Sequence, residues 1–119
     1  MNKNNLPDKQ SNFFLYTGND GKVNIEVFMQ DETVWLTQKA IGELFGKSKA
    51  IISEHLKKIY AEGELEMEST VRKFRTVQAE GSRKVERGLE FYNLNAIISV
   101  GYRVNSYQAT QLRIWITKP

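Results

Sequence analysis

The sequence has no cysteine, one histidine and two prolines in 119 residues. Without cysteine the chain has neither a disulfide framework nor a thiolate metal site, which is compatible with a reducing compartment. The longest aliphatic stretch, residues 96–100, is far too short to span a bilayer. Residues 1–12 are polar and lack the apolar core of a secretion signal. These absences predict a cytoplasmic protein.

Residue patterns that carry catalysis are equally scarce. His55 falls on the apolar side of a predicted helix, where a packed histidine is more common than a catalytic one. There is no glycine-rich phosphate loop, because Gly42 and Gly46 fall within a predicted helix and at its end. The acidic segment 62–68 lacks the mixed oxygen ligands of a calcium loop. We expect no enzymatic activity and no metal or cofactor.

The size and composition are those of one globular domain, with 40% hydrophobic and 26% charged residues. We expect residues 1–12 to form a disordered tail and residues 13–119 a single domain. The last predicted helix runs to the end of the sequence without a clear capping signal. Two alternatives follow: the domain ends at Pro119, or the chain is a truncated form of a longer protein.

The segment 35–59 has the pattern of two short helices joined by a tight turn. Thr37 is placed to cap the first helix and Ser48 the second. Gly46 follows the first helix, where a left-handed backbone conformation favours glycine. Each helix has one apolar face at helical spacing, formed by Ala40, Ile41, Leu44 and Phe45, then by Ile51, Ile52, His55, Leu56 and Ile59. This arrangement is typical of a helix-turn-helix unit.

A small sheet is predicted before the helices. Residues 13–16 and 23–29 form a β-hairpin around segment 18–21, which is rich in residues that tolerate a positive φ. After a further turn, residues 33–36 form a short strand that enters the first helix. We expect this sheet to pack on the helices, with Trp35 as a core anchor.

A second hairpin is predicted after the helices. Residues 70–79 and 83–93 flank segment 80–82, which has the composition of a turn. Apolar residues recur at every third position of the first arm, a spacing that suits a helix as well as a bulged strand; we interpret it as a strand. Residues 66–68 fit either a frayed helix end or a loop. A basic hairpin after a helix-turn-helix is the layout of a winged helix, so we expect an α+β fold of winged-helix type.

Two further helices are predicted at the C-terminus. Asn95 is placed to cap the first, which presents apolar residues inward, namely Ile97, Ile98, Gly101 and Val104. Ser106 is placed to cap the second, over residues 107–117. The second helix has an apolar face formed by Leu112, Trp115 and Ile116.

Positive charge collects in two segments. Residues 47–58 contain four basic residues and one acidic residue, and residues 70–88 contain six basic and two acidic residues. Between them, residues 60–68 contain four glutamates and no base, while residues 1–36 have a net charge of −2. A polyanion would contact two basic elements, with the acidic connection facing away. The competing interpretation is that these segments are ordinary solvated faces.

The helix-turn-helix predicts double-stranded DNA as partner, with the second helix, 48–60, in the major groove and hairpin 70–93 on the backbone. Residues predicted to contact bases are Ser48, Lys49, Ala50, Ser53 and Glu54. Residues predicted to contact the DNA backbone are Thr37, Gln38, Lys47, Lys57, Arg72, Lys73, Arg75, Arg83 and Lys84.

A protein-interaction module is the alternative, such as an antirepressor, an antitoxin-like partner or an oligomerisation domain. In that case Leu112, Trp115 and Ile116 of the final helix would form an apolar patch for another subunit. A homodimer through this helix is compatible with DNA binding, since two half-sites improve affinity and specificity.

Three segments carry a resemblance to a known family: VWLTQKAIGELFGKSKAIISEHLKKIYAEGEL, STVRKFRTVQAEGSRKVERGLEFYNLNAIISVGYRVNS and QLRIWITK. Over roughly residues 13–118 the chain resembles the N-terminal part of the RhuM family of bacterial virulence-associated proteins. More loosely, it is similar to the Bro-N type domains of phage and viral regulators. The resemblance implies a bacterial DNA-binding protein encoded near mobile elements or pathogenicity islands, with no defined reaction. Family members usually continue well beyond the RIW motif, whereas this chain stops at Pro119.

Overall fold

The computed structural model describes residues 13–18, 21 and 23–117, and of residues 76–80 the backbone alone. The predicted tail, 1–12, and part of the first predicted turn therefore lie outside the described residues. The elements in chain order are β1 (Phe13–Thr17), β2 (Asn24–Gln30), β3 (Thr33–Leu36), α2 (Gln38–Phe45), α3 (Lys49–Ala61), α4 (Met67–Thr70), β4 (Val71–Glu80), β5 (Arg83–Asn93), α5 (Leu94–Arg103) and α6 (Gln108–Thr117). The predicted α+β class is confirmed.

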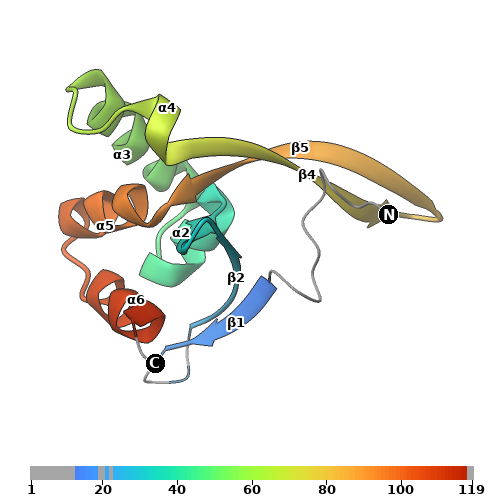
Figure 1. The fold of residues 1–119 in the computed structure, drawn as a ribbon, viewed down its shortest axis with the longest axis horizontal. Helices are drawn as coiled ribbons and strands as arrows, with labels where there is room; N and C mark the ends of the chain where they lie inside the picture. Colours follow the sequence, from blue (N-terminus) through green and yellow to red (C-terminus); the bar gives the residue numbers. More distant parts are fainter. Residues whose placement is uncertain (1–12, 19–20, 22, 118–119) are drawn as a thin grey trace.

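The strands form one antiparallel sheet in the order β1-β2-β3-β5-β4. Both predicted hairpins are present, β1–β2 and β4–β5. Asp31 and Glu32 join β2 to β3 with φ angles of 56° and 60°, the conformation of a tight hairpin turn. The helices lie toward one end of the sheet, and the β4–β5 hairpin extends away from them (Figure 1).

The sheet carries apolar side chains on both faces. The main core joins one face to the helices and contains, for example, Val34, Leu36, Ile41, Ile52 and Ile97, all at most 1% exposed. A second cluster of Phe28, Trp35 and Phe91 lies on the opposite face. Because successive strand residues point to opposite faces, burying Val34 and Leu36 against the helices directs Trp35 away from them. Trp35 is buried as predicted, but not in the core that the helices cover.

The predicted helix caps of α2 and α3 are confirmed. Thr37 Oγ1 accepts a hydrogen bond from the backbone N–H of Ala40, and Ser48 Oγ accepts one from that of Ile51, each at 3.2 Å. Gly46 has a φ of 67° and ends α2 in the left-handed conformation. One residue of the predicted apolar face of α3 is not buried: Ile51 is 42% exposed, because the buried stripe of the helix runs through Ile52, Leu56 and Ile59.

Three local features differ from the sequence-based expectations or resolve them. Residues 66–68 are neither a frayed end nor a loop throughout, since the short helix α4 begins at Met67. The cap of α5 is Asn93, not Asn95: the Asn93 side chain accepts from the N–H of Ala96 at 3.2 Å, because β5 runs directly into the helix. The segment with apolar residues at every third position is a strand, β4, as predicted. Val71 packs on the main core and Phe74 on the second cluster, so these residues lie on opposite faces of the strand.

The acidic connection after α3 is held by α5. The Arg103 guanidinium donates to the carboxylates of Glu62 at 2.7 Å and Glu64 at 2.9 Å. The hydrogen bond between Arg103 and Glu64 lowers the pKa of Glu64 below its ordinary value, with the charge of Arg103 adding to the effect.

We expect Gly42→Ala to destabilise the fold. Alanine is the better helix former, but a Cβ at position 42 would lie 2.6 Å from the carbonyl oxygen of Lys47, in the turn that folds back over α2. The turn must shift, at a cost of about 1–3 kcal/mol in the free energy of unfolding. Urea denaturation measures it, with the exposed Glu43→Ala on the same helix as a control. A Gly42→Ala variant as stable as the wild type would contradict the close approach.

We expect the stabilisation contributed by Arg103 to disappear in acid. Since Arg103 lowers the pKa of Glu64 in the folded state, the ion pair stabilises the fold above the unfolded carboxyl pKa of about 4.3 and is lost as pH falls through the folded pKa. The free energies of unfolding of the wild type and Arg103→Gln, compared from pH about 7 to about 3, should therefore converge. Arg113→Gln, which removes a cation without an ion pair among the described residues, should show a pH-independent difference.

Candidate nucleic-acid interface

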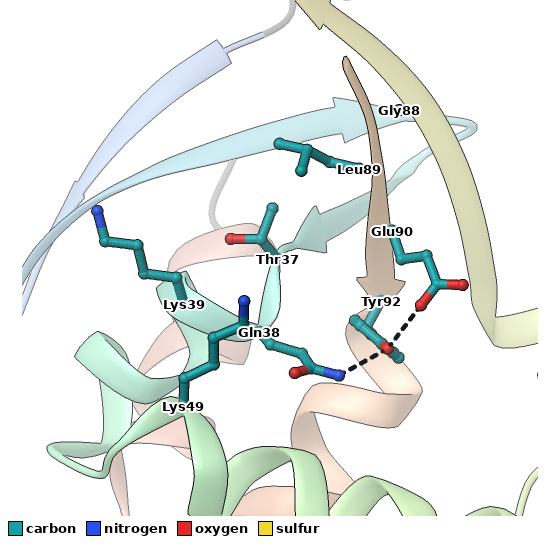
Figure 2. Close-up of a pocket in the computed structure, with 8 residues that line it drawn as sticks. All are labelled: Thr37, Gln38, Lys39, Lys49, Gly88, Leu89, Glu90 and Tyr92. Carbon is teal, nitrogen blue, oxygen red and sulfur yellow. Dashed lines mark hydrogen bonds between the residues drawn. The ribbon is translucent and has the colours of Figure 1, made fainter.

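The N-termini of α2 and α3 and the C-terminal half of β5 line one pocket of about 370 Å³. Its lining residues are Thr37, Gln38, Lys39, Lys49, Gly88, Leu89, Glu90 and Tyr92. Figure 2 shows the side chains of Lys39 and Lys49 on one side of this space and those of Glu90 and Tyr92 on the other. The two elements that the sequence marks as basic, the second helix and the hairpin, therefore line one pocket.

The first turn of α3 is open to solvent. Lys47, Ser48, Lys49 and Ala50 are all exposed there. Further along the helix, Glu54 and Lys57 are exposed and Ser53 is half-buried. Among the described residues, no ion pair engages Lys47, Lys49 or Lys57. Of the predicted base-contacting residues, Ser48, Lys49, Ala50 and Glu54 are thus accessible to solvent, whereas Ser53 is partly covered.

Thr37 and Gln38 are both engaged within the protein. Thr37 Oγ1 is the cap of α2. The Gln38 side chain donates from Nε2 to the Tyr92 hydroxyl at 2.9 Å, and that hydroxyl lies 3.3 Å from Glu90 Oε1, to which it donates (Figure 2). The Gln38 side chain therefore points toward β5. The groups of α2 that can bind an anion are therefore the positive N-terminal end of the helix dipole and the Lys39 side chain.

The hairpin cations are distributed over two faces of the sheet. Lys73 lies opposite Glu90 in the register, and Arg75 donates to Glu86 at 2.9 Å, on the face of the hairpin that also carries Tyr92. Arg72 lies on the other face, where it pairs with Asp31 at 2.5 Å and stacks 4.7 Å above the Trp35 ring. The alternation of the strand thus separates Arg72 from Lys73, which the charge count had grouped together.

The two cations nearest the hairpin turn are exposed. Arg83 and Lys84 open β5 directly after the turn residues Gly81 and Ser82. Among the described residues, no ion pair engages Lys84 or Arg83. Both side chains are therefore accessible to an external phosphate.

Three residues of this pocket, Lys39, Glu90 and Tyr92, are not among the predicted contact residues. Lys39 lies outside the two segments where basic residues cluster, although a lysine in the first turn of the first helix is a usable signal. Tyr92 is 4% exposed, and burial raises the pKa of its phenol. It lies 54 residues from Gln38, and no local pattern reveals a contact at that separation.

The apolar face of the final helix, α6, packs against the main core. Leu112 is fully buried, so the expectation that it forms part of a free partner-binding patch is wrong. Trp115 and Ile116 are half-buried against the main core, and the Trp115 ring lies 5.2 Å from that of Tyr16. The exposed apolar residues of this region are Tyr102, Tyr107 and Ile114.

Two other features are absent from the described residues, a metal site and a membrane span. No three His, Asp or Glu side chains there are grouped so as to hold a metal ion. None of the described helices combines the length and hydrophobicity that crossing a membrane requires.

The comparisons with known proteins bear on the second half of the chain. No curated protein and no solved structure matches the chain significantly. The family model that matches is that of the Virulence protein RhuM family, over residues 69–119. The match begins within α4 and includes β4, β5, α5 and α6, while α2 and α3 lie outside it. Over residues 69–119, the chain resembles the Virulence protein RhuM family.

Proposed function

We propose that the chain binds double-stranded DNA as a helix-turn-helix module of winged-helix type. The observation that carries the proposal is the shared surface of the exposed α3 N-terminus and β5, with Lys39 and Lys49 beside the same pocket. The first turn of α3 would enter the major groove, and the hairpin would follow the backbone. The proposal assigns no reaction and needs no cofactor.

The order of the elements supports the winged-helix assignment. A strand, β3, leads into the helix pair α2 and α3, and the β4–β5 hairpin follows with β5 paired to β3. This is the layout in which a hairpin stands beside a helix-turn-helix. In Figure 1 the hairpin projects well beyond the helices, as a wing that reaches along DNA would do.

The charges support the division of roles. Lys49 and Ala50 at the start of α3 have the chemistry to contact guanine and the thymine methyl group, and Glu54 can accept from cytosine. Lys39, Lys47, Arg83 and Lys84 would neutralise phosphates. Arg72 and Arg75 are already paired with Asp31 and Glu86, so we assign them weaker roles.

Selection from a random duplex pool, with binding measured over a salt series, tests the proposal. We expect an enriched sequence and an affinity that falls with a log–log slope of about −0.9 per neutralised phosphate. Absence of duplex binding at low salt would overturn the proposal.

Replacing Arg83 and Lys84 by alanine tests the hairpin. If each contacts a phosphate, the salt slope should become shallower by about 2 units in total, without a change in the selected sequence. The control is Arg113→Ala, which removes an exposed cation from α6 and should leave the slope unchanged. A wild-type slope in the double variant would remove the hairpin end from the interface.

Lys49→Ala tests the reading role of α3. If Lys49 contacts a base, the variant should lose discrimination at one position of the selected site, at a cost of about 1–3 kcal/mol. Lys58→Ala, in the last turn of the same helix, is the matched control. Any loss of affinity in this variant should be the same for all sequences. Selection profiles of the two variants measure the difference. Identical profiles would exclude Lys49 from base recognition.

A further inference from the structure

The β4–β5 hairpin is joined to the other strands only at its base, as far as the described residues show. β5 pairs with β3 at Trp35–Asn93 and Leu36–Tyr92, and the remainder of β5 pairs with β4. From this base to the turn the hairpin extends about 30 Å, at about 3.3 Å per residue. A tilt of roughly 5° at the base would therefore move the turn by about 3 Å, enough to break a phosphate contact.

A buried phenol connects the base of β5 to α2. The Tyr92 ring is part of the main core, and its hydroxyl accepts from Gln38 Nε2 at 2.9 Å. The same hydroxyl donates to Glu90 Oε1 at 3.3 Å, so both of its hydrogen-bonding roles are used. Gln38 is the first residue of α2. This hydrogen bond therefore links the start of the helix pair to the strand that carries Arg83 and Lys84.

A second phenol connects α3 to the start of β4. The Tyr60 hydroxyl lies 2.8 Å from Thr70 Oγ1, and that oxygen donates to the Glu66 carbonyl at 2.7 Å. Thr70 is only 3% exposed and directly precedes the first residue of β4. Burial also raises the pKa of Tyr60 above its ordinary value. The Gln38–Tyr92 hydrogen bond thus joins α2 to β5, and the Tyr60–Thr70 hydrogen bond joins α3 to the residue that precedes β4.

We infer that Tyr92 and Tyr60 are positioning residues that fix the angle between the hairpin and the helix pair. By holding this angle they let the hairpin cations and the first turn of α3 contact one duplex together. The inference rests on the proposed DNA binding and extends it, because neither phenol contacts DNA. On the opposite face, the aromatic cluster and the Arg72–Asp31 pair hold the hairpin from behind, so the phenols complete a two-sided clamp.

Tyr92→Phe removes one hydroxyl and leaves every cation in place. Gln38 is half-buried and can turn its amide to water, so we expect a cooperatively folded variant with a small loss of stability. Its duplex affinity should fall about 10-fold, and its salt slope should become shallower toward that of the Arg83→Ala, Lys84→Ala double variant. Adding Tyr92→Phe to that double variant should cause no further loss, because the contacts it positions are already gone.

Tyr102→Phe is the matched control, since Tyr102 is 77% exposed and should tolerate loss of its hydroxyl. Wild-type affinity and slope in Tyr92→Phe would overturn the inference, as would losses that add fully in the triple variant. Tyr60→Phe should behave like Tyr92→Phe.

A measurement without DNA separates this inference from the proposed function. Because the natural chain has no cysteine, Ser82→Cys and Lys58→Cys provide unique sites for two spin labels, on the hairpin turn and at the end of α3. Tyr92→Phe should broaden or shift the distance distribution between the labels. An unchanged distribution would overturn the positioning role, whereas a wild-type protein that fails to bind duplex would overturn only the proposed function.

Discussion

Two pairs of residues, Trp35 with Asn93 and Leu36 with Tyr92, join the first three strands to the β4–β5 hairpin. Both pairs lie at the C-terminal ends of their strands, so β3 and β5 overlap only where each is about to become a helix. Thr37 and Asn93, the caps of α2 and α5, consequently start two helices from the same short ladder. The main core, the helix pair and the hairpin all depend on this junction.

The junction explains why polar groups occur so close to the core. Strands that overlap over two residues cannot fix the direction of a long hairpin by backbone hydrogen bonds alone. Apolar packing behind the hairpin and directional hydrogen bonds in front of it supply the remaining constraints. Since apolar packing is non-directional and a hydrogen bond restricts both distance and angle, the two kinds of contact complement each other.

Much of the fold could be predicted from the sequence, because helix caps, turns and hairpins are determined by residues close together in the chain. The caps Thr37 and Ser48, the glycine turn and both hairpins follow from the chemistry of neighbouring residues. The predictions that were wrong or incomplete concern features that depend on the neighbouring strand or on the packing of the core. The face on which Trp35 lies, the separation of Arg72 from Lys73 and the exposure of Ile51 depend on which side of each element the core occupies. The Gln38–Tyr92 contact joins distant segments and could not be read from sequence, so the candidate surface was predicted only in outline.

Because side chains alternate between the two faces of the hairpin, its length can change without altering the contacts at its base. Inserting residues in pairs, one pair in each strand near Gly81, would lengthen the hairpin by about 7 Å and keep every existing side chain on its face. Inserting a single residue in each strand, between the base and the Arg83–Lys84 pair, would instead exchange the faces of those two residues. The base, with its clamp on both sides, would be unaffected in either case. The span of the hairpin can therefore change in discrete steps while the core stays the same.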